Sequence, residues 1–148
     1  MTTPIHFSHT IDVGHEPKKV FALLDDLTMT PRWLERCTGI DKLSSGPNAA
    51  GTKLRYAYRE AGRTGTMDGE IVARIADERL TFRYGDKMMD VAVDFHVTSA
   101  AAGARLTHTI DITPKNMLAK LFAPFIRRGL PRQTITAMDR LRTLLDQS

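Results

Sequence analysis

Two histidines stand in the same tetrapeptide, His-Thr-Ile-Asp, near opposite ends of this 148-residue chain. One copy begins at His9 and the other at His108, and each lies in a run where apolar and polar residues alternate. Imidazole groups on an apolar face can exchange a proton, orient a polar atom of a ligand or bind a metal ion. The role open to these two histidines depends on whether the fold brings them together.

The two alternating runs match as antiparallel strands when His9 is set opposite His108. Opposite charges directly across two strands contribute roughly 0.2–1 kcal/mol per pair, and a slip of one residue would turn the apolar set outward. This register gives apolar pairs on the inner face and charge pairs on the outer face: Ile5 with Ile112, Phe7 with Ile110, Ile11 with Leu106, Asp12 with Arg105, and His6 with Asp111. We therefore predict that His9 and His108 both face inward and are neutral at pH 7, because burial lowers the pKa of a histidine.

Two roles stay open for this pair. The histidines form a hydrogen-bonded pair in the core, or they orient a polar ligand atom and act as acid and base. A metal site is not expected, because two histidines supply only half of a four-ligand zinc set and no third candidate faces inward on these strands.

Three tyrosines form the second group that could do chemistry. Tyr56, Tyr58 and Tyr84 fall on apolar faces of central strands, where a buried hydroxyl needs a hydrogen-bond partner. Packing and ligand orientation are both open to them, since a few polar groups on dry walls are typical of a ligand pocket. Methionines on the same faces are adaptable fillers. The candidate ligand-binding residues are His9, Tyr56, Tyr58, Met67, Phe82, Tyr84, Phe95, His108 and Met117. No catalytic residue is assigned.

Basic side chains gather in the last third of the chain. Arg127, Arg128 and Arg132 follow Lys115 and Lys120, in a protein with a formal net charge of +4. A solvated surface is the usual meaning of such a cluster, and contact with phosphate or a membrane surface stays open. Nucleic-acid binding is not expected, because it requires exposed aromatic residues and those of this chain fall on faces predicted to be inward.

Composition excludes several other classes. The chain is 42% hydrophobic and 26% charged, which is typical of a soluble globular protein. It has neither a run of about 20 apolar residues nor a signal-like start, so we expect a cytoplasmic protein. Cys37 is the only cysteine, which predicts a reduced, partly buried thiol. No dinucleotide or phosphate-loop fingerprint is present, so no cofactor is expected. Asp25 and Asp26 are predicted to form a solvated helix end.

These groups must be positioned by a strand, two short helices, six further strands and a helical C-terminal segment. Residues 5–13 alternate as a strand does, and the period then becomes helical with Pro17 in the first helical position. Thr30 is a predicted cap for the second helix. Residues 39–113 contain the six strands, separated by short turns. In one of them, Ala73 and Ile75 are predicted to face inward and Arg74 outward.

The C-terminal segment is predicted to begin after a cap at Thr113. An apolar stripe of helical spacing runs through its second half, which ends at Ser148. Pro124, Gly129 and Pro131 interrupt its middle, so we expect two helical pieces joined near Gly129, the first of them a mobile gate.

The stretch "HEPKKVFALLDDLTMTPRWLERCTGI", Gly51 after a loop and the helix end "LLDQS" resemble the START-like (SRPBCC) superfamily. That group includes polyketide cyclases and dehydrases and lipid-transport proteins. The resemblance covers nearly the whole chain and implies one domain over residues 1–148 with an α+β helix-grip fold. In that fold a curved seven-stranded antiparallel sheet wraps around a long C-terminal helix. Val20, Phe21 and Leu24 resemble core positions, and Trp33 resembles a packing residue.

Physical reasoning supports the same arrangement, because a sheet with one apolar face has to cover it and only the C-terminal helix is left to do so. A sheet curled around one helix leaves a cavity wherever side chains do not fill the space. We therefore expect a small hydrophobic or amphipathic ligand such as a lipid, polyketide or aromatic metabolite. A cyclase or dehydratase that uses cavity histidines and tyrosines, and an interaction module with a filled cavity, stay open as alternatives. Monomer and homodimer are both open.

Overall fold

The computed structural model describes residues 4–60 and 62–148, and its framework is a seven-stranded antiparallel sheet. The strands lie in the order β1-β7-β6-β5-β4-β3-β2, so the first strand of the chain pairs with the last. Their bounds are β1 (Ile5–Val13), β2 (Cys37–Lys42), β3 (Lys53–Glu60), β4 (Arg63–Ile75), β5 (Arg79–Gly85), β6 (Met89–Ala100) and β7 (Gly103–Pro114).

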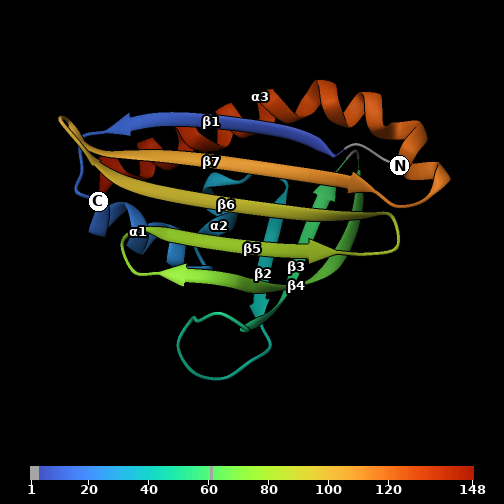
Figure 1. Cartoon of the computed structure of the whole chain (residues 1–148), viewed down its shortest axis with the longest axis horizontal. Helices are drawn as coiled ribbons and strands as arrows, with labels where there is room; N and C mark the ends of the chain where they lie inside the picture. The colour runs from blue at the N-terminus through green and yellow to red at the C-terminus, as the bar shows by residue number, and fades with distance from the viewer. Residues whose placement is uncertain (1–3, 61) are drawn as a thin grey trace.

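Three helices complete the fold: α1 (Pro17–Asp25), α2 (Thr30–Trp33) and α3 (Met117–Gln147). Figure 1 shows β2 and β3 running across the direction of β1, β7, β6 and β5, so that the sheet curls, with α3 lying along β1 and β7. The predicted α+β helix-grip fold is confirmed. No helix in the described part of the chain is long and apolar enough to span a bilayer.

The register of β1 against β7 is the predicted one. His9 lies opposite His108, and Ile5 lies opposite Ile112. On the outer face, Arg105 donates two hydrogen bonds to Asp12, of 2.8 and 3.2 Å. Matched apolar and charged pairs on both faces thus join the two ends of the chain.

The predicted helix starts are confirmed only in part. Pro17 does occupy the first turn of α1, but Thr30 lies inside α2 rather than at its cap. Thr113 is not a cap either, because it continues the ladder of β7 opposite Asp90. The side chain of Asn116 caps α3 instead, accepting a hydrogen bond of 2.8 Å from the backbone N–H of Ala119.

The C-terminal segment is one continuous helix, so the predicted division near Gly129 is wrong. Pro124 and Pro131 both lie inside α3, which follows a curved path in Figure 1. Each proline removes one backbone hydrogen bond. Burial of one side of the helix, at Leu130 and Met138 among others, holds the segment against the fold on both sides of Pro131. Tertiary packing has therefore overridden local propensity.

A β-bulge in β4 reverses the predicted faces at its end. The register against β5 shifts between Ile71 and Ala73, so that Arg74 lies opposite the buried Leu80 and faces inward. Ile75, predicted to be inward, is exposed. The extra residue inserted by a bulge breaks the strict alternation on which the prediction depended.

The inward Arg74 meets Asp25 at the end of α1, which corrects the prediction of a solvated carboxylate. Its guanidinium donates two hydrogen bonds of 3.0 and 2.8 Å to the Asp25 carboxylate and lies 5.3 Å from the centre of the Phe21 ring. Asn48 donates a third bond of 3.1 Å. Burial by itself would raise the pKa of Asp25, but the bonds from Arg74 and Asn48 outweigh it and hold that pKa below its usual value.

This pair yields a test of the bulge. Asp25→Asn should lower the free energy of unfolding at pH 7 by about 1.5–3 kcal/mol, the range for a hydrogen bond to a charged group. Because the folded pKa is depressed, the contribution is present above the unfolded pKa of about 3.9 and is lost as the pH falls through the folded pKa. Urea unfolding should therefore show the difference from wild type shrinking below about pH 4. An Asp41→Asn control changes an exposed carboxylate on β2 and should behave like wild type.

Candidate functional site

A cavity of about 120 Å³ lies between the inner face of the sheet and helices α2 and α3. Strands β3 to β7 supply most of its wall, and Thr134 enters it from α3. Pockets that hold drug-sized ligands measure roughly 300–1,000 Å³. The cavity as it stands therefore admits only a small molecule or one part of a larger one.

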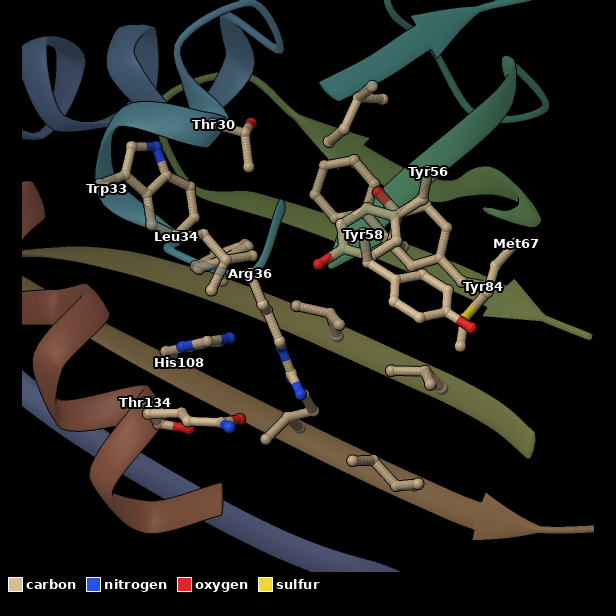
Figure 2. Close-up of a pocket in the computed structure, with 18 of the residues that line it drawn as sticks. Thr30, Trp33, Leu34, Arg36, Tyr56, Tyr58, Met67, Tyr84, His108 and Thr134 are labelled. Carbon is tan, nitrogen blue, oxygen red and sulfur yellow. The ribbon is translucent and has the colours of Figure 1, made fainter. Parts of the chain in front are cut away.

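Aromatic rings cross the wall from one strand to the next. Tyr56 stacks on Tyr58 with ring centres 6.3 Å apart and contacts Tyr84 at 4.9 Å. Phe82 follows at 5.8 Å from Tyr84. Figure 2 shows the three tyrosines gathered at one end of the cavity, with Met67 beside Tyr84. This row of rings makes that end of the cavity apolar, with hydroxyl groups as its polar features.

Two glycines of β4 leave space for these rings. A side-chain carbon on Gly69 would lie 2.2 Å from the Tyr84 ring, and one on Gly65 would lie 2.6 Å from the Tyr58 hydroxyl. Each glycine pairs directly with the tyrosine that it accommodates. The flat aromatic wall thus depends on close approach to bare backbone.

The other end of the row is His108. Its side chain is only 4% exposed, and its ring stacks on Phe95 with centres 4.4 Å apart. The Nδ1 atom has no hydrogen-bond partner among the described residues. Burial first, then electrostatic repulsion from Arg36 and from the imidazole of His9, lowers the pKa of His108 to about 3. The predicted neutral imidazole is confirmed at this position.

Arg36 brings a permanent positive charge to the same region. Figure 2 shows its side chain extending between the tyrosines and His108. The guanidinium lies 3.8 Å from the Glu60 carboxylate, which also accepts a hydrogen bond of 3.3 Å from Gln133 of α3. At 3.8 Å the ion pair is too long for a strong hydrogen bond, so the guanidinium retains capacity to bind another acceptor.

Outside these side chains lies a groove of about 650 Å³ between α3 and the β2–β3 end of the sheet. Leu34, Arg36, Glu60 and Gln133 line both the groove and the inner cavity. These four side chains, which we call the partition, separate the two spaces. If the partition moves, the inner cavity becomes continuous with the larger outer groove.

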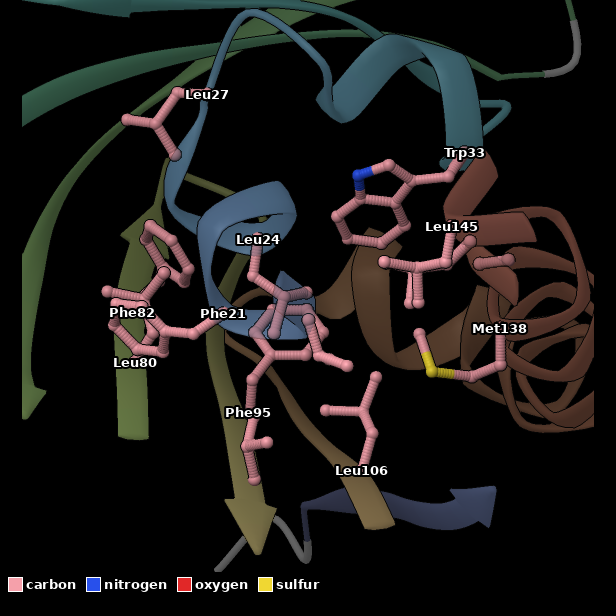
Figure 3. Close-up of a cluster of buried hydrophobic side chains, with 14 of the residues drawn as sticks. Phe21, Leu24, Leu27, Trp33, Leu80, Phe82, Phe95, Leu106, Met138 and Leu145 are labelled. Atoms are coloured by element: carbon pink, nitrogen blue, oxygen red, sulfur yellow. The ribbon is translucent and has the colours of Figure 1, made fainter. Parts of the chain in front are cut away.

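The main hydrophobic core closes the cavity on its opposite side. Figure 3 shows Phe82 and Phe95 of the sheet facing Leu24 of α1, with Trp33 packed nearby above Leu145 of α3. Phe95 and Trp33 meet edge to face with ring centres 5.7 Å apart. Because these residues belong to the core and also line the cavity, that end of the site is rigidly held.

Two tyrosines and one cysteine in or near the cavity wall have raised pKa values. Burial raises the pKa of Tyr56 and of Tyr84, and it raises the pKa of the buried Cys37 thiol to about 11. All three groups therefore stay protonated near neutral pH. Tyr56 and Tyr84 line the cavity and can orient a ligand as hydrogen-bond donors, whereas Cys37 lies outside the lining.

The structure brings most of the predicted site residues together. Seven of them line the cavity: Tyr56, Tyr58, Met67, Phe82, Tyr84, Phe95 and His108. His9 faces His108 across the strands but lies outside the cavity lining, where it stacks on Phe7 at 6.4 Å. Met117 does not line the cavity, because it stands on the outer side of α3 with 72% of its surface exposed.

Sequence reasoning missed the polar residues of the partition. Arg36 precedes β2, Glu60 ends β3 and Gln133 lies in the middle of α3. Each reads as an ordinary surface residue in its own segment, so no local pattern could have joined them. Trp33 was predicted for packing alone, yet it also lines the cavity.

A family model described as "Polyketide cyclase / dehydrase and lipid transport" matches residues 4–146. Uncharacterized proteins of Mycobacterium tuberculosis and Mycobacterium bovis are 30% identical over 138 residues, which covers 88% of this chain and 81% of theirs. Among solved structures, the Zhui aromatase/cyclase from a Streptomyces species superposes with a TM-score of 0.79 at 13% identity, covering 96% of this chain and 93% of that one. A START superfamily protein from Mycobacterium smegmatis gives 0.78 at 13% identity, covering 96% and 97%.

His108 provides a test of the dry site. The pKa of His108 is lower in the folded than in the unfolded protein, so this group favours the folded state at neutral pH. That contribution to the free energy of unfolding is lost as the pH falls below the unfolded pKa of about 6.5. Between pH 7 and pH 5 the wild type should lose about 2 kcal/mol through this group. His108→Leu should remove that loss and change stability at pH 7 by no more than about 1–3 kcal/mol.

Chemical denaturation at a series of pH values measures both effects. The matched control is His96→Leu on β6, a histidine away from the cavity, and this variant should retain the wild-type dependence at acid pH. A His108→Leu protein that still follows the wild-type pH profile would show that the ring is not held in a dry, neutral state.

Proposed function

Because this chain belongs to the polyketide cyclase/dehydrase and lipid-transport family of START-like proteins, we propose that it binds a small hydrophobic or amphipathic molecule between its sheet and α3. One observation carries the proposal: a row of aromatic rings lines the cavity and ends at two polar groups, Arg36 and His108. Mostly apolar walls with a few convergent polar groups are what small-molecule sites require.

The arrangement favours a ligand with an apolar or aromatic body and an oxygen-bearing end. The tyrosine end offers ring faces and hydroxyl donors to the body. At the other end the guanidinium of Arg36 favours a carbonyl, hydroxyl or carboxylate oxygen, because it carries several donors and no acceptor. The Nδ1 atom of His108 adds one hydrogen-bonding position beside it. A lipid, a polyketide or an aromatic metabolite has this chemistry.

Entry of such a ligand requires the partition to move. The inner cavity of about 120 Å³ is smaller than any of these molecules needs, whereas the outer groove offers about 650 Å³. Displacement of Arg36 from Glu60 would join the two spaces and release the guanidinium toward the ligand. The three polar residues of the partition are held by one long ion pair and one hydrogen bond, and such contacts near the surface contribute little stability, so these side chains can move at low cost.

Binding is favoured over acid–base catalysis by the protonation of the cavity groups. A general acid or base works best when its pKa lies near the operating pH. The pKa of His108 is lowered to about 3, and the pKa of Tyr56 is raised by burial, so neither matches neutral solution. The groups that an enzyme of this design would use are instead suited to hold and orient a molecule.

Two fluorescent probes test the proposed polarity. We expect 1-anilinonaphthalene-8-sulfonate and the neutral N-phenyl-1-naphthylamine both to bind the folded protein. Arg36→Met should lower the affinity for the sulfonate probe roughly ten-fold or more, because a hydrogen bond to a charged group contributes about 1.5–3 kcal/mol. The affinity for the neutral probe should change much less. Titrations at constant protein concentration measure both affinities.

The control is Arg55→Met on β3, whose guanidinium is half exposed and lies outside the cavity lining. It should leave both affinities unchanged. Near-ultraviolet circular dichroism must remain native throughout, since loosely packed proteins also bind these dyes. Equal weakening of both probes in Arg36→Met, or binding of neither probe to the wild type, would rule out the proposed site.

The partition predicts a kinetic effect. Glu60→Ala removes the acceptor that holds both Arg36 and Gln133, so the neutral probe should associate several-fold faster in stopped-flow experiments. Glu70→Ala is the matched control, because it breaks an exposed ion pair with Lys53 on the same sheet. Identical association rates in the wild type and in Glu60→Ala would show that these side chains do not limit entry.

A further inference from the structure

The first turns of α3 present large apolar side chains to solvent. Five of them are between 50% and 72% exposed and form what we call the apolar face: Met117, Leu118, Leu121, Phe122 and Phe125. Residues at these spacings fall on one side of an α-helix. The rings of Phe122 and Phe125 lie 6.4 Å apart in a tilted contact. The face is therefore one continuous surface.

The apolar face is not the side of α3 that packs on the sheet. Ala119 and Leu130 are buried, and they lie on the opposite side of the helix from Leu121 and Phe125. The first half of α3 is thus apolar on both sides, whereas a helix at the surface of a globular protein is normally polar on its outer side. The prediction that all aromatic residues face inward is wrong at Phe122 and Phe125. Folding leaves this surface uncovered, so it marks an interaction site.

Only positive charges accompany the apolar face. Lys120, Arg127, Arg128 and Arg132 are all exposed along α3, and no acidic residue occurs between Asp111 and Asp139 in the sequence. Within the described ranges, none of these four forms an ion pair closer than 4.0 Å. An apolar helix face flanked by lysine and arginine is complementary to a bilayer that carries anionic lipids.

We propose that the first half of α3 docks on an anionic membrane surface. The apolar face enters the boundary between headgroups and acyl chains, and Lys120, Arg127 and Arg128 contact lipid phosphates. A second copy of the chain fits this face less well, because pairing it with itself would bring two sets of unneutralised cations together. A single-stranded nucleic acid fits less well too, because its bases stack on aromatic rings and would make no such contact with the aliphatic side chains of the face.

Docking would place the outer groove close to the bilayer, since Arg132 lines that groove and follows Arg127 and Arg128 along α3.

The proposed docking does not depend on the proposed ligand site, because none of the residues of the apolar face lines the cavity. The two proposals can therefore fail separately.

Vesicle sedimentation tests the docking. Phosphatidylcholine vesicles that contain phosphatidylglycerol should bind the wild type, and pure phosphatidylcholine vesicles should bind it much less. Arg127→Gln with Arg128→Gln should weaken binding to the anionic vesicles roughly thirty-fold, from about five-fold per cation near the surface. Leu121→Gln with Phe125→Gln should reduce binding to the anionic vesicles below detection. The matched control is Val72→Gln with Ile75→Gln, which alters two exposed apolar residues at the β4 bulge and should bind like the wild type.

All three double variants change exposed side chains, and unchanged thermal unfolding and unchanged binding of N-phenyl-1-naphthylamine would show that fold and cavity are intact. Binding to anionic vesicles that survives both α3 variants would overturn the proposal. A wild-type dimer in sedimentation velocity that Leu121→Gln with Phe125→Gln converts to monomer would assign the face to a second copy instead. Binding of a single-stranded oligonucleotide without binding of anionic vesicles would assign the cations to nucleic acid.

Discussion

One helix has to cover the inner face of a strongly curled sheet, and the site follows from that constraint. The second half of α3, together with α1 and α2, packs one end of the face tightly through Leu24, Phe95 and Met138. A cylinder of fixed radius cannot fill a surface that curls away from it, so aromatic rings line the remaining space and a cavity persists between them. The core and the proposed ligand site are therefore two ends of one packing arrangement.

Burial then decides the chemistry of that space. In a dry environment a histidine loses its proton and tyrosines keep theirs, as the pKa shifts of His108 and Tyr56 illustrate. Arg36 contributes a guanidinium, a cation with several hydrogen-bond donors and no acceptor. What results is one cation, loosely paired with the Glu60 carboxylate, among neutral donors at the point where the cavity meets the outer groove. This combination of charges supports the proposed binding of an oxygen-bearing molecule.

The helix that closes the cavity also has two different halves. Its second half is amphipathic in the usual sense, with Leu141 and Leu145 buried and charged residues outside. Its first half is apolar on both sides, and Pro124 and Pro131 reduce its own hydrogen bonding. A segment of this kind depends on external contacts for its stability, whether from the sheet or from a bilayer surface.

The amino-acid sequence by itself determined the strands, their faces and the β1–β7 register, because side chains alternate with period two and charge pairs report directly on which residues are opposite. Seven of the nine predicted ligand-binding residues therefore line the cavity. Tertiary structure alone decided the bulge that turns Arg74 inward, the continuity of α3 and the outward position of Met117. It also decided the meeting of Arg36, Glu60 and Gln133, which lie on three separate segments. Periodicity specifies the side of an element on which a residue lies. How deeply that side is buried, and which groups face it, depend on packing between elements that are distant in sequence.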